Sequence, residues 1–150
     1  LLAQAQASGI AAQVEFLGHR SNVEDFVAAA DVGVLPSTIE GLSNSLLEFM
    51  ASGLPTIASR VSGSEDMVID GNNGWLFDVG DRAALARCLA EAAASDRARL
   101  CQLGLAARAR IAHVASLEVV VGKLLALYRG TRPAELRDDA VAEPTASGGA

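Results

Sequence analysis

The sequence has 150 residues, of which 51% are hydrophobic, 20% are charged and only 4% are aromatic. This length and composition predict one globular domain with a real core, and they favour an α/β layer protein over a β-sandwich. The net charge of -6 and the pI of about 4.8 argue against a nucleic-acid-binding protein held by phosphate contacts. The two cysteines, Cys88 and Cys101, form no C-x-x-C pair and predict buried thiols rather than a disulfide.

Targeting signals are absent from the sequence pattern. We find neither a basic segment before an apolar run nor an apolar run of about 18 residues, so we expect no signal peptide and no membrane span. Leu1–Ala7 already has the composition of a helix and follows no initiator methionine. We therefore expect a cytoplasmic protein of which this chain is a piece.

The sequence from Val14 to Leu35 predicts a strand, a helix and a second strand. Val14–Leu17 has strand composition, and the following helix is expected from Ser21 to about Ala30, with Ser21 and Glu24 as an S-x-x-E capping box. A strand over Val32–Leu35 comes after a very short connection. Alternation of strands with helices implies parallel strands joined by right-handed crossovers.

The central stretch predicts a strand–loop–helix–strand unit. Ser45–Ser52 is the expected helix, Gly53 its C′ residue, and Pro55 prevents continuation, so that Thr56–Ala58 begins the next strand. The N-terminus of such a helix leaves backbone N–H groups unpaired and carries roughly +0.5 of an elementary charge. This unit is therefore suited to bind an anion.

The remaining elements are mainly helical. A short helical turn is expected over Glu65–Val68 and a last strand over Trp75–Phe77. Three helices complete the fold, over Arg82 to about Ala94 with Asp81 as N-cap, Asp96 to about Ala112, and Ser116 to about Arg129. The stretch 131–150 is rich in Pro, Ala, Gly and acidic residues and predicts a disordered tail.

Polar residues gather where the predicted strands end. In parallel sheets ligands bind beyond the carboxyl ends of the strands. The loops Gly18–Asn22, Ser37–Asn44 and Ser59–Glu65 therefore lie on one edge and hold most of the candidate site residues.

Two carboxylates frame the predicted helix N-terminus, with seven residues between them. Glu48 permits two interpretations: the return half of a capping box with Ser45, or an acceptor for a ribose diol, whose two hydroxyls match its two oxygens. Glu40 also permits two interpretations. It lies beside Gly41, where the backbone can approach a ligand, or it is simply a solvent-exposed acidic residue of the loop.

The segment EGLSNSLLEFMASGLPTIAS resembles the E-x7-E signature of retaining nucleotide-sugar glycosyltransferases, family 4 in particular. The resemblance runs from about Val14 to about Gly130. It includes VEFLGHRSNVEDFVAAADVGVLPS before the signature and GSEDMVIDGNNGWLFDVGD after it. It implies a Rossmann-like parallel sheet flanked by helices. Residues 1–130 would be the donor-binding, C-terminal domain of a GT-B enzyme, truncated at its start, and 131–150 the tail.

The resemblance also implies a reaction and site residues. The reaction is retaining transfer of a sugar from a nucleotide diphosphate sugar to a hydroxyl acceptor, which is a sugar, a lipid-linked sugar or a small molecule. Glu40 is the catalytic candidate, contacting the transferred sugar. Leu42-Ser43 stands where the family often has an aromatic residue or Pro, which bears on the choice of sugar. The donor-binding candidates are Glu48, Gly41, Leu42, Ser43, Asn44, Ser45 and, over the nucleobase, Gly18, His19 and Arg20.

The same resemblance indicates which cofactors and partners to expect. The donor is the only cofactor-like molecule expected, and His19 and His113 form no metal-binding pair. The family neutralises the diphosphate with a basic pair on earlier loops, and none precedes Val14. We therefore expect an N-terminal domain upstream of Leu1, an inactive isolated fragment, no nucleic-acid partner, and peripheral contact of the missing domain with the inner membrane face.

Three other functions stay open at this point. A nucleotide-sugar epimerase of the same architecture would take an acid/base pair from the missing domain. A non-catalytic nucleotide-sugar-binding module would need only the donor site. A response-regulator-like domain would need an Asp ending a strand, and Leu35-Pro36-Ser37 offers none. The base, the sugar and the acceptor are not specified by the sequence.

Deleting residues 131–150 is expected to leave the thermal midpoint nearly unchanged, because the stretch has no apolar face to bury. Thermal unfolding of the chain with and without these residues measures the effect. A fall of more than a few degrees, which corresponds to about 1 kcal/mol in a domain of this size, would show that the tail packs.

Overall fold

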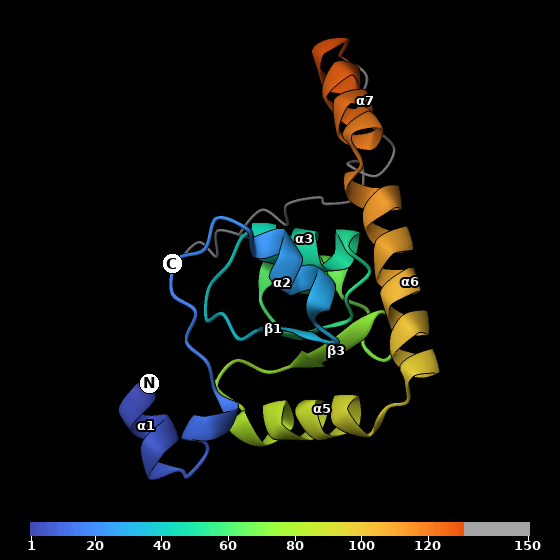
Figure 1. Ribbon diagram of the computed structural model, residues 1–150. Coiled ribbons are helices and arrows are strands. Elements are labelled where there is room, and N and C mark those ends of the chain that lie inside the picture. The colour runs from blue at the N-terminus through green and yellow to red at the C-terminus, as the bar shows by residue number, and fades with distance from the viewer. Residues whose placement is uncertain (131–150) are drawn as a thin grey trace, which may run out of the picture.

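The computed structural model describes residues 1–130, and the predicted disordered tail over 131–150 lies outside the described residues. Figure 1 shows the central sheet surrounded by helices, with the last helix extending away from this body. In chain order the elements are α1 (Leu2–Ala7), the 3-10 helix η1 (Ala11–Gln13), α2 (Val23–Ala29), β1 (Gly33–Leu35), α3 (Asn44–Ala51), β2 (Thr56–Ser59), α4 (Ser62–Met67), β3 (Gly74–Phe77), α5 (Arg82–Ala94), α6 (Arg97–Ala115) and α7 (Leu117–Tyr128).

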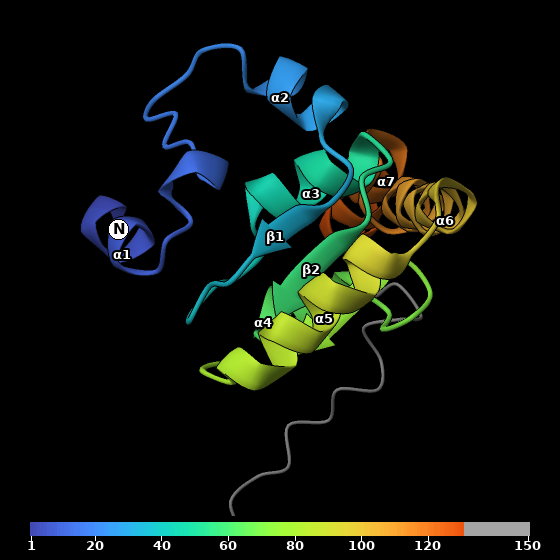
Figure 2. The same ribbon diagram turned by 60° about the horizontal axis from the view of Figure 1, so that its bottom comes forward.

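The sheet has three parallel strands in the order β1-β2-β3. Its register pairs Leu35 with Ala58 and Ser59 with Phe77. Figure 2 shows α3 on one side of the sheet and α5 on the other. Each connection between strands contains a helix, which returns the chain to the starting edge of the sheet. The predicted α/β architecture with parallel strands and flanking helices is confirmed.

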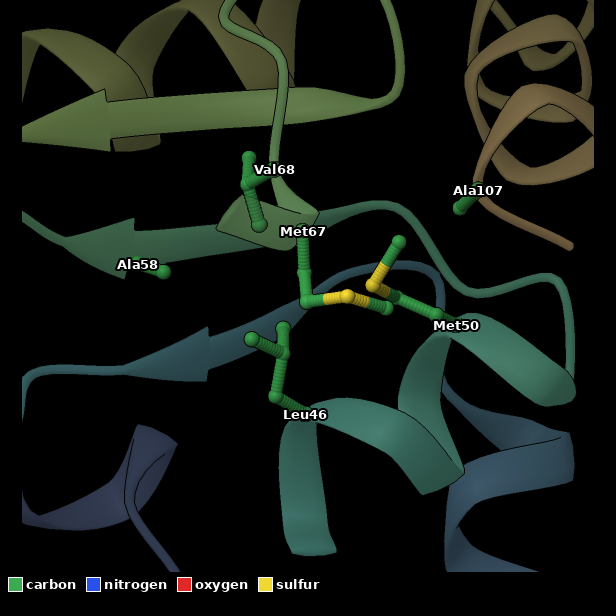
Figure 3. Close-up of a cluster of buried hydrophobic side chains, with 6 residues drawn as sticks. All are labelled: Leu46, Met50, Ala58, Met67, Val68 and Ala107. Atoms are coloured by element: carbon green, nitrogen blue, oxygen red, sulfur yellow. The ribbon is translucent and has the colours of Figure 1, made fainter. Parts of the chain in front are cut away.

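The core on the α3 side fixes that helix on the sheet. Leu46 and Met50 lie one helical turn apart, and Figure 3 shows them gathered with Ala58 of β2 and with Met67 and Val68 around the end of α4. All five side chains are at most 2% exposed. Burying a side chain such as Leu or Met contributes about 1.5–3 kcal/mol. The direction of α3, and therefore of its N-terminus, is set by this packing.

The end of α3 has the predicted geometry. Gly53 adopts a φ of 75°, and its N–H donates to the Met50 carbonyl at 3.0 Å. The Leu54 N–H donates to the Phe49 carbonyl at 2.9 Å, which completes a Schellman motif. The expected role of Gly53 as the C′ residue is confirmed, and the chain turns directly into β2.

Helix α6 packs its backbone against this turn. A Cβ on Gly104 would lie 1.9 Å from the Gly53 carbonyl oxygen, so only glycine permits the observed approach. One turn and a half further along α6, the Arg110 guanidinium donates to the Asp66 carbonyl at 2.7 Å. Contacts at these two points hold α6 against the turn after α3 and against α4.

The predicted strand over Val14–Leu17 is wrong. These residues lie between η1 and α2 without belonging to a strand, and Phe16 is 49% exposed. A strand requires a neighbour that satisfies its N–H and C=O groups. Within the described residues β1 pairs only with β2, and this segment pairs with neither β1 nor β3.

The predicted capping box of α2 is also wrong. The helix begins at Val23 with Asn22 as N-cap, one position later than the box requires. The Asn22 side-chain amide donates to the Asp25 carboxylate at 2.9 Å. This local pair takes the place of the expected bond between Ser21 and Glu24.

Helix α7 has the predicted apolar stripe, but the stripe is not buried. Tyr128 is 87% exposed and Leu117 is 78% exposed. The other members of the stripe are between 41% and 48% exposed (Val120, Val121, Leu124 and Leu125). In Figure 1, α7 projects beyond α6 and away from the sheet. Periodicity predicted the helix correctly, whereas its burial depends on contacts that the described residues do not provide.

One stretch departs from the expectation that no membrane span is present. Arg97–Tyr128 is long and apolar enough to cross a membrane by length and composition alone. The backbone turns at Ser116, with a ψ of 154°, so this stretch is two helices of 19 and 12 residues. A span needs about 20 residues of continuous helix, so composition by itself is weak support for one here.

The cysteines are both free, as predicted, but they are not both buried. Cys88 is half-buried and Cys101 is exposed. Burial raises the pKa of the Cys88 thiol, and the nearby carboxylates of Asp70 and Glu91 raise it further. The Cys88 thiol is therefore a weakly reactive group on α5.

Two helix-interior glycines provide a matched test of the α6 contact. Gly104→Ala is expected to lower the free energy of unfolding by about 1–3 kcal/mol or more, because its Cβ overlaps the Gly53 carbonyl oxygen. Gly122→Ala, in α7, meets nothing within 4 Å and is expected to stabilise the chain by up to about 1 kcal/mol through helix propensity. Urea denaturation measures both. Equal effects of the two substitutions would contradict the close packing of α6.

Candidate functional site

The N-terminus of α3 is open to a ligand. The helix begins at Asn44 with Ser43 as N-cap, and no side chain among the described residues caps it. The backbone N–H groups of Asn44, Ser45 and Leu46 precede the first helical bond, from Leu47 to the Ser43 carbonyl at 3.1 Å. Leu46 is fully buried, whereas Asn44 and Ser45 are exposed, so two donors at the positive end of the helix dipole remain for an anion or for hydroxyl groups.

The start of α3 rules out one of the two interpretations of Glu48, the capping box. Ser45 lies inside the helix rather than at its N-cap, so Ser45 and Glu48 do not form the capping box that the spacing allowed. The Glu48 side chain is exposed on the surface of α3. The structure thus removes a local structural role for this carboxylate and leaves it accessible to a ligand.

Glu48 lies at a hollow of about 450 Å³ between α3 and the junction of α6 with α7. Arg108 is the other charged residue in its wall. The remaining lining residues are apolar or small (Leu47, Ala51, Ile111, Ala112, Ala115 and Ser116). A ligand held by Glu48 would have an apolar surface beside it.

Glu40 is held by its own loop. It is half-buried, and the Ser37 hydroxyl donates to its Oε1 at 3.0 Å. Its other carboxylate oxygen has no protein partner among the described residues. Glu40 is therefore oriented on one side and can accept a hydrogen bond on the other.

The loop between β1 and α3 is fixed by a backbone contact that sequence reasoning missed. A Cβ on Gly63, in the first turn of α4, would lie 1.6 Å from the carbonyl oxygen of Gly41. Gly63 is buried, and its neighbour Ser64 has a buried hydroxyl without a partner among the described residues. The glycine in Val61-Ser62-Gly63-Ser64 was the available signal, but only its non-local neighbour reveals its role.

The loop between η1 and α2 is placed differently from the expectation. Gly18 has a φ of 65°, and Gly18, His19 and Arg20 are all exposed. They form no side-chain hydrogen bond or ion pair within residues 1–130. Figures 1 and 2 show their segment running outside the layered body, so the strand end that was expected to position them is not formed.

One cation lies at the carboxyl ends of the strands. Arg60 directly follows β2, and its side chain pairs with Asp78 at 3.2 Å and with Glu65 at 3.7 Å. These pairs join the segments after β2 and β3. Arg60 is thereby neutralised and does not replace the basic pair that a diphosphate requires. Residues 1–130 contain no group of three metal-ligating side chains placed to hold a metal ion.

The fold agrees with that of known sugar-transferring enzymes. Sucrose-phosphate synthase from Thermosynechococcus elongatus is 31% identical, with a TM-score of 0.77 over 85% of this chain and 32% of that protein. Anabaena HepE in complex with UDP is 23% identical, with a TM-score of 0.79 over 85% of this chain and 35% of that protein. The fold is that of the C-terminal part of GT-B glycosyltransferases.

The sequence comparison identifies the family. The family described as "Glycosyl transferases group 1" matches residues 1–95, and the chain belongs to it. The lipopolysaccharide core biosynthesis glycosyltransferase LpsE of Rhizobium meliloti is 36% identical over 98 residues, which cover 64% of this chain and 29% of LpsE. The chain therefore spans about a third of the length of these relatives.

Gly63→Ala is expected to displace the loop that precedes α3, because the added methyl group cannot share space with the Gly41 carbonyl. Affinity for UDP should fall at least about tenfold if that loop forms the donor site. Ser62→Ala, at the exposed first residue of α4, is the matched control and should leave UDP affinity unchanged. Isothermal titration calorimetry measures both. Unchanged affinity in Gly63→Ala would contradict the role of this contact.

Proposed function

We propose that this chain is the donor-binding part of a retaining glycosyltransferase of family 4 type, which transfers a sugar from a nucleotide diphosphate sugar to a hydroxyl acceptor. Membership of the group 1 family, the GT-B fold and the UDP complex of Anabaena HepE support this proposal.

The observation that carries the proposal is the uncapped N-terminus of α3 between Glu40 and Glu48. The backbone N–H groups of the exposed residues Asn44 and Ser45, which no side chain caps, suit the distal phosphate and the sugar hydroxyls. Positive charge at the helix end offsets the negative charge that develops on the leaving diphosphate. Glu48, which caps no helix end, accepts hydrogen bonds from the ribose diol, and Glu40 contacts the transferred sugar.

The other candidates take supporting roles in the proposal. Gly41, Leu42, Ser43 and the first residues of α3 form the cradle around the sugar and the distal phosphate. Gly18–Arg20 lies over the nucleobase in the assembled site, where Arg20 can stack on the base. No metal takes part, and the diphosphate is neutralised by basic residues outside this chain, since Arg60 is already paired with two carboxylates.

The whole protein includes an N-terminal domain that completes the cleft and supplies most acceptor contacts. The matched part covers 29% of LpsE and 32% of sucrose-phosphate synthase, which is consistent with a second domain of comparable size. The isolated chain is accordingly inactive in transfer. The protein is cytoplasmic, with the N-terminal domain in peripheral contact with the inner membrane face when the acceptor is lipid-linked.

Glu48→Gln separates ligand binding from structure. The substitution exchanges one acceptor oxygen for a donor and removes a charge-assisted hydrogen bond worth about 1.5–3 kcal/mol. We expect UDP affinity to fall roughly ten- to a hundredfold, while the free energy of unfolding changes by less than about 0.5 kcal/mol. Calorimetric titration and urea denaturation measure the two quantities.

Glu40→Gln and Glu91→Gln complete this experiment. Glu40→Gln should retain UDP affinity, because UDP lacks the sugar, and should lower turnover in the intact protein. Glu91→Gln changes an exposed acid on α5 and should alter neither property. A Glu48→Gln variant that binds UDP as tightly as the unchanged protein would refute the assignment of Glu48. An intact protein without measurable UDP affinity would refute the proposed function.

A further inference from the structure

Two serines outside the predicted site connect the sheet to the carboxylate of Glu40. Resting on the proposed function, we infer that Ser37 and Ser59 are positioning residues that fix the Glu40 carboxylate for the transfer reaction. The connection runs from the last residue of β2 to the loop after β1 and from there to Glu40.

The first link replaces a backbone hydrogen bond that the sheet does not make. Leu35 pairs with Ala58, so the next opposed residues would be Pro36 and Ser59. Because the Gly33 N–H donates to the Pro55 carbonyl at 2.9 Å, alternate residues of β1 face β2, and Ser37 rather than Pro36 would make the next ladder bonds. The Val61 N–H, which would reach the Ser37 carbonyl in a continued ladder, donates to the Ser59 carbonyl at 2.9 Å. The Ser59 hydroxyl instead donates across to the Ser37 carbonyl at 2.5 Å, with the Leu35 carbonyl at 3.4 Å as a second acceptor.

Burial makes this first link strong and specific. Ser59 is 1% exposed, so water cannot replace its acceptors. A buried hydroxyl that loses its partner keeps its desolvation cost, and a buried carbonyl does the same. The side chain of Ser59 therefore holds the backbone of Ser37 in one place relative to the rigid end of β2.

The second link transfers that position to the carboxylate. The Ser37 hydroxyl donates to Oε1 of Glu40 at 3.0 Å, across three residues of the loop. The same loop is held from its other side by the contact between Gly41 and Gly63. Glu40 is thus fixed between two anchored points, and its second oxygen is left for the substrate. A site that depends on a carboxylate needs such support, because a displacement of about 1 Å can cost roughly a hundredfold in rate.

The test compares Ser37→Ala, Ser37→Thr and Ser59→Ala in the intact protein. Ser37→Ala and Ser59→Ala should lower kcat for sugar transfer from UDP-glucose at least about tenfold, with the KM for the donor changed less than about threefold. Ser37→Thr keeps the hydroxyl and should retain most of the activity. Thr38→Ala removes an exposed hydroxyl from the same loop without a hydrogen bond in residues 1–130, and it should behave like the unchanged protein.

A second measurement does not depend on enzymatic activity. A glutamyl endopeptidase cleaves after Glu40 only when the loop leaves its anchored position, so Ser37→Ala and Ser59→Ala should accelerate cleavage at Glu40–Gly41 at least about fivefold. Mass spectrometry compares this site with cleavage after Glu24 in the same sample. Equal cleavage rates in Ser37→Ala and the unchanged protein would overturn the positioning role, whether or not the protein transfers glucose. Accelerated cleavage in a protein that neither binds UDP nor transfers sugar would support the anchoring of Glu40 and refute the proposed function instead.

Discussion

The parallel pairing of β1 with β2 is the constraint on which the site depends. β1 pairs through only three residues and ends at Leu35, because the Val61 N–H donates to the Ser59 carbonyl and does not continue the ladder to Ser37. From that point the chain must leave the sheet, and it does so at the edge where ligands of parallel α/β proteins bind. The Ser59 hydroxyl secures the departing chain, so the loop that carries Glu40 begins from a fixed position.

Helix α3 is positioned by contacts at both of its ends and along its buried side. Leu46 and Met50 pack it against the sheet, and the Schellman motif at Gly53 connects it directly to β2. Because α6 touches that turn through Gly104, the C-terminal half of the chain holds the helix that presents Glu48. The chemistry proposed for the loop therefore relies on residues more than fifty positions away from it.

Some surfaces are left uncovered by the described residues, as expected if the protein, like its longer relatives, has a further domain. Three surfaces lack a covering partner among the described residues. They are the apolar stripe on α7, the edge of β1 that faces away from β2, and the loop over Gly18–Arg20, whose proposed role is to bind the nucleobase. The matched part of this chain covers only 29% of the sequence-similar glycosyltransferase LpsE. The donor site proposed for this chain is, on this view, one half of a cleft.

The sequence by itself determined the features that depend on neighbouring residues. Asp81 begins α5 by accepting the Ala84 N–H at 2.8 Å, Gly53 ends α3, and helical connections require parallel strands. The spacing of Glu40 and Glu48 was readable in the same way. Each of these features is encoded within one or two turns of chain, where propensity, capping and connection length decide the outcome.

Only the tertiary structure decided the features that depend on distant residues. Val14–Leu17 has strand composition but no partner strand, and α7 has an apolar stripe but no covering surface. The anchoring of Glu40 arises from Ser59 and Gly63, which lie about twenty residues further along the chain. A hydroxyl that replaces a missing ladder bond and two backbones in contact at glycines have no local signature, because they exist only once the strands have paired and the helices have packed.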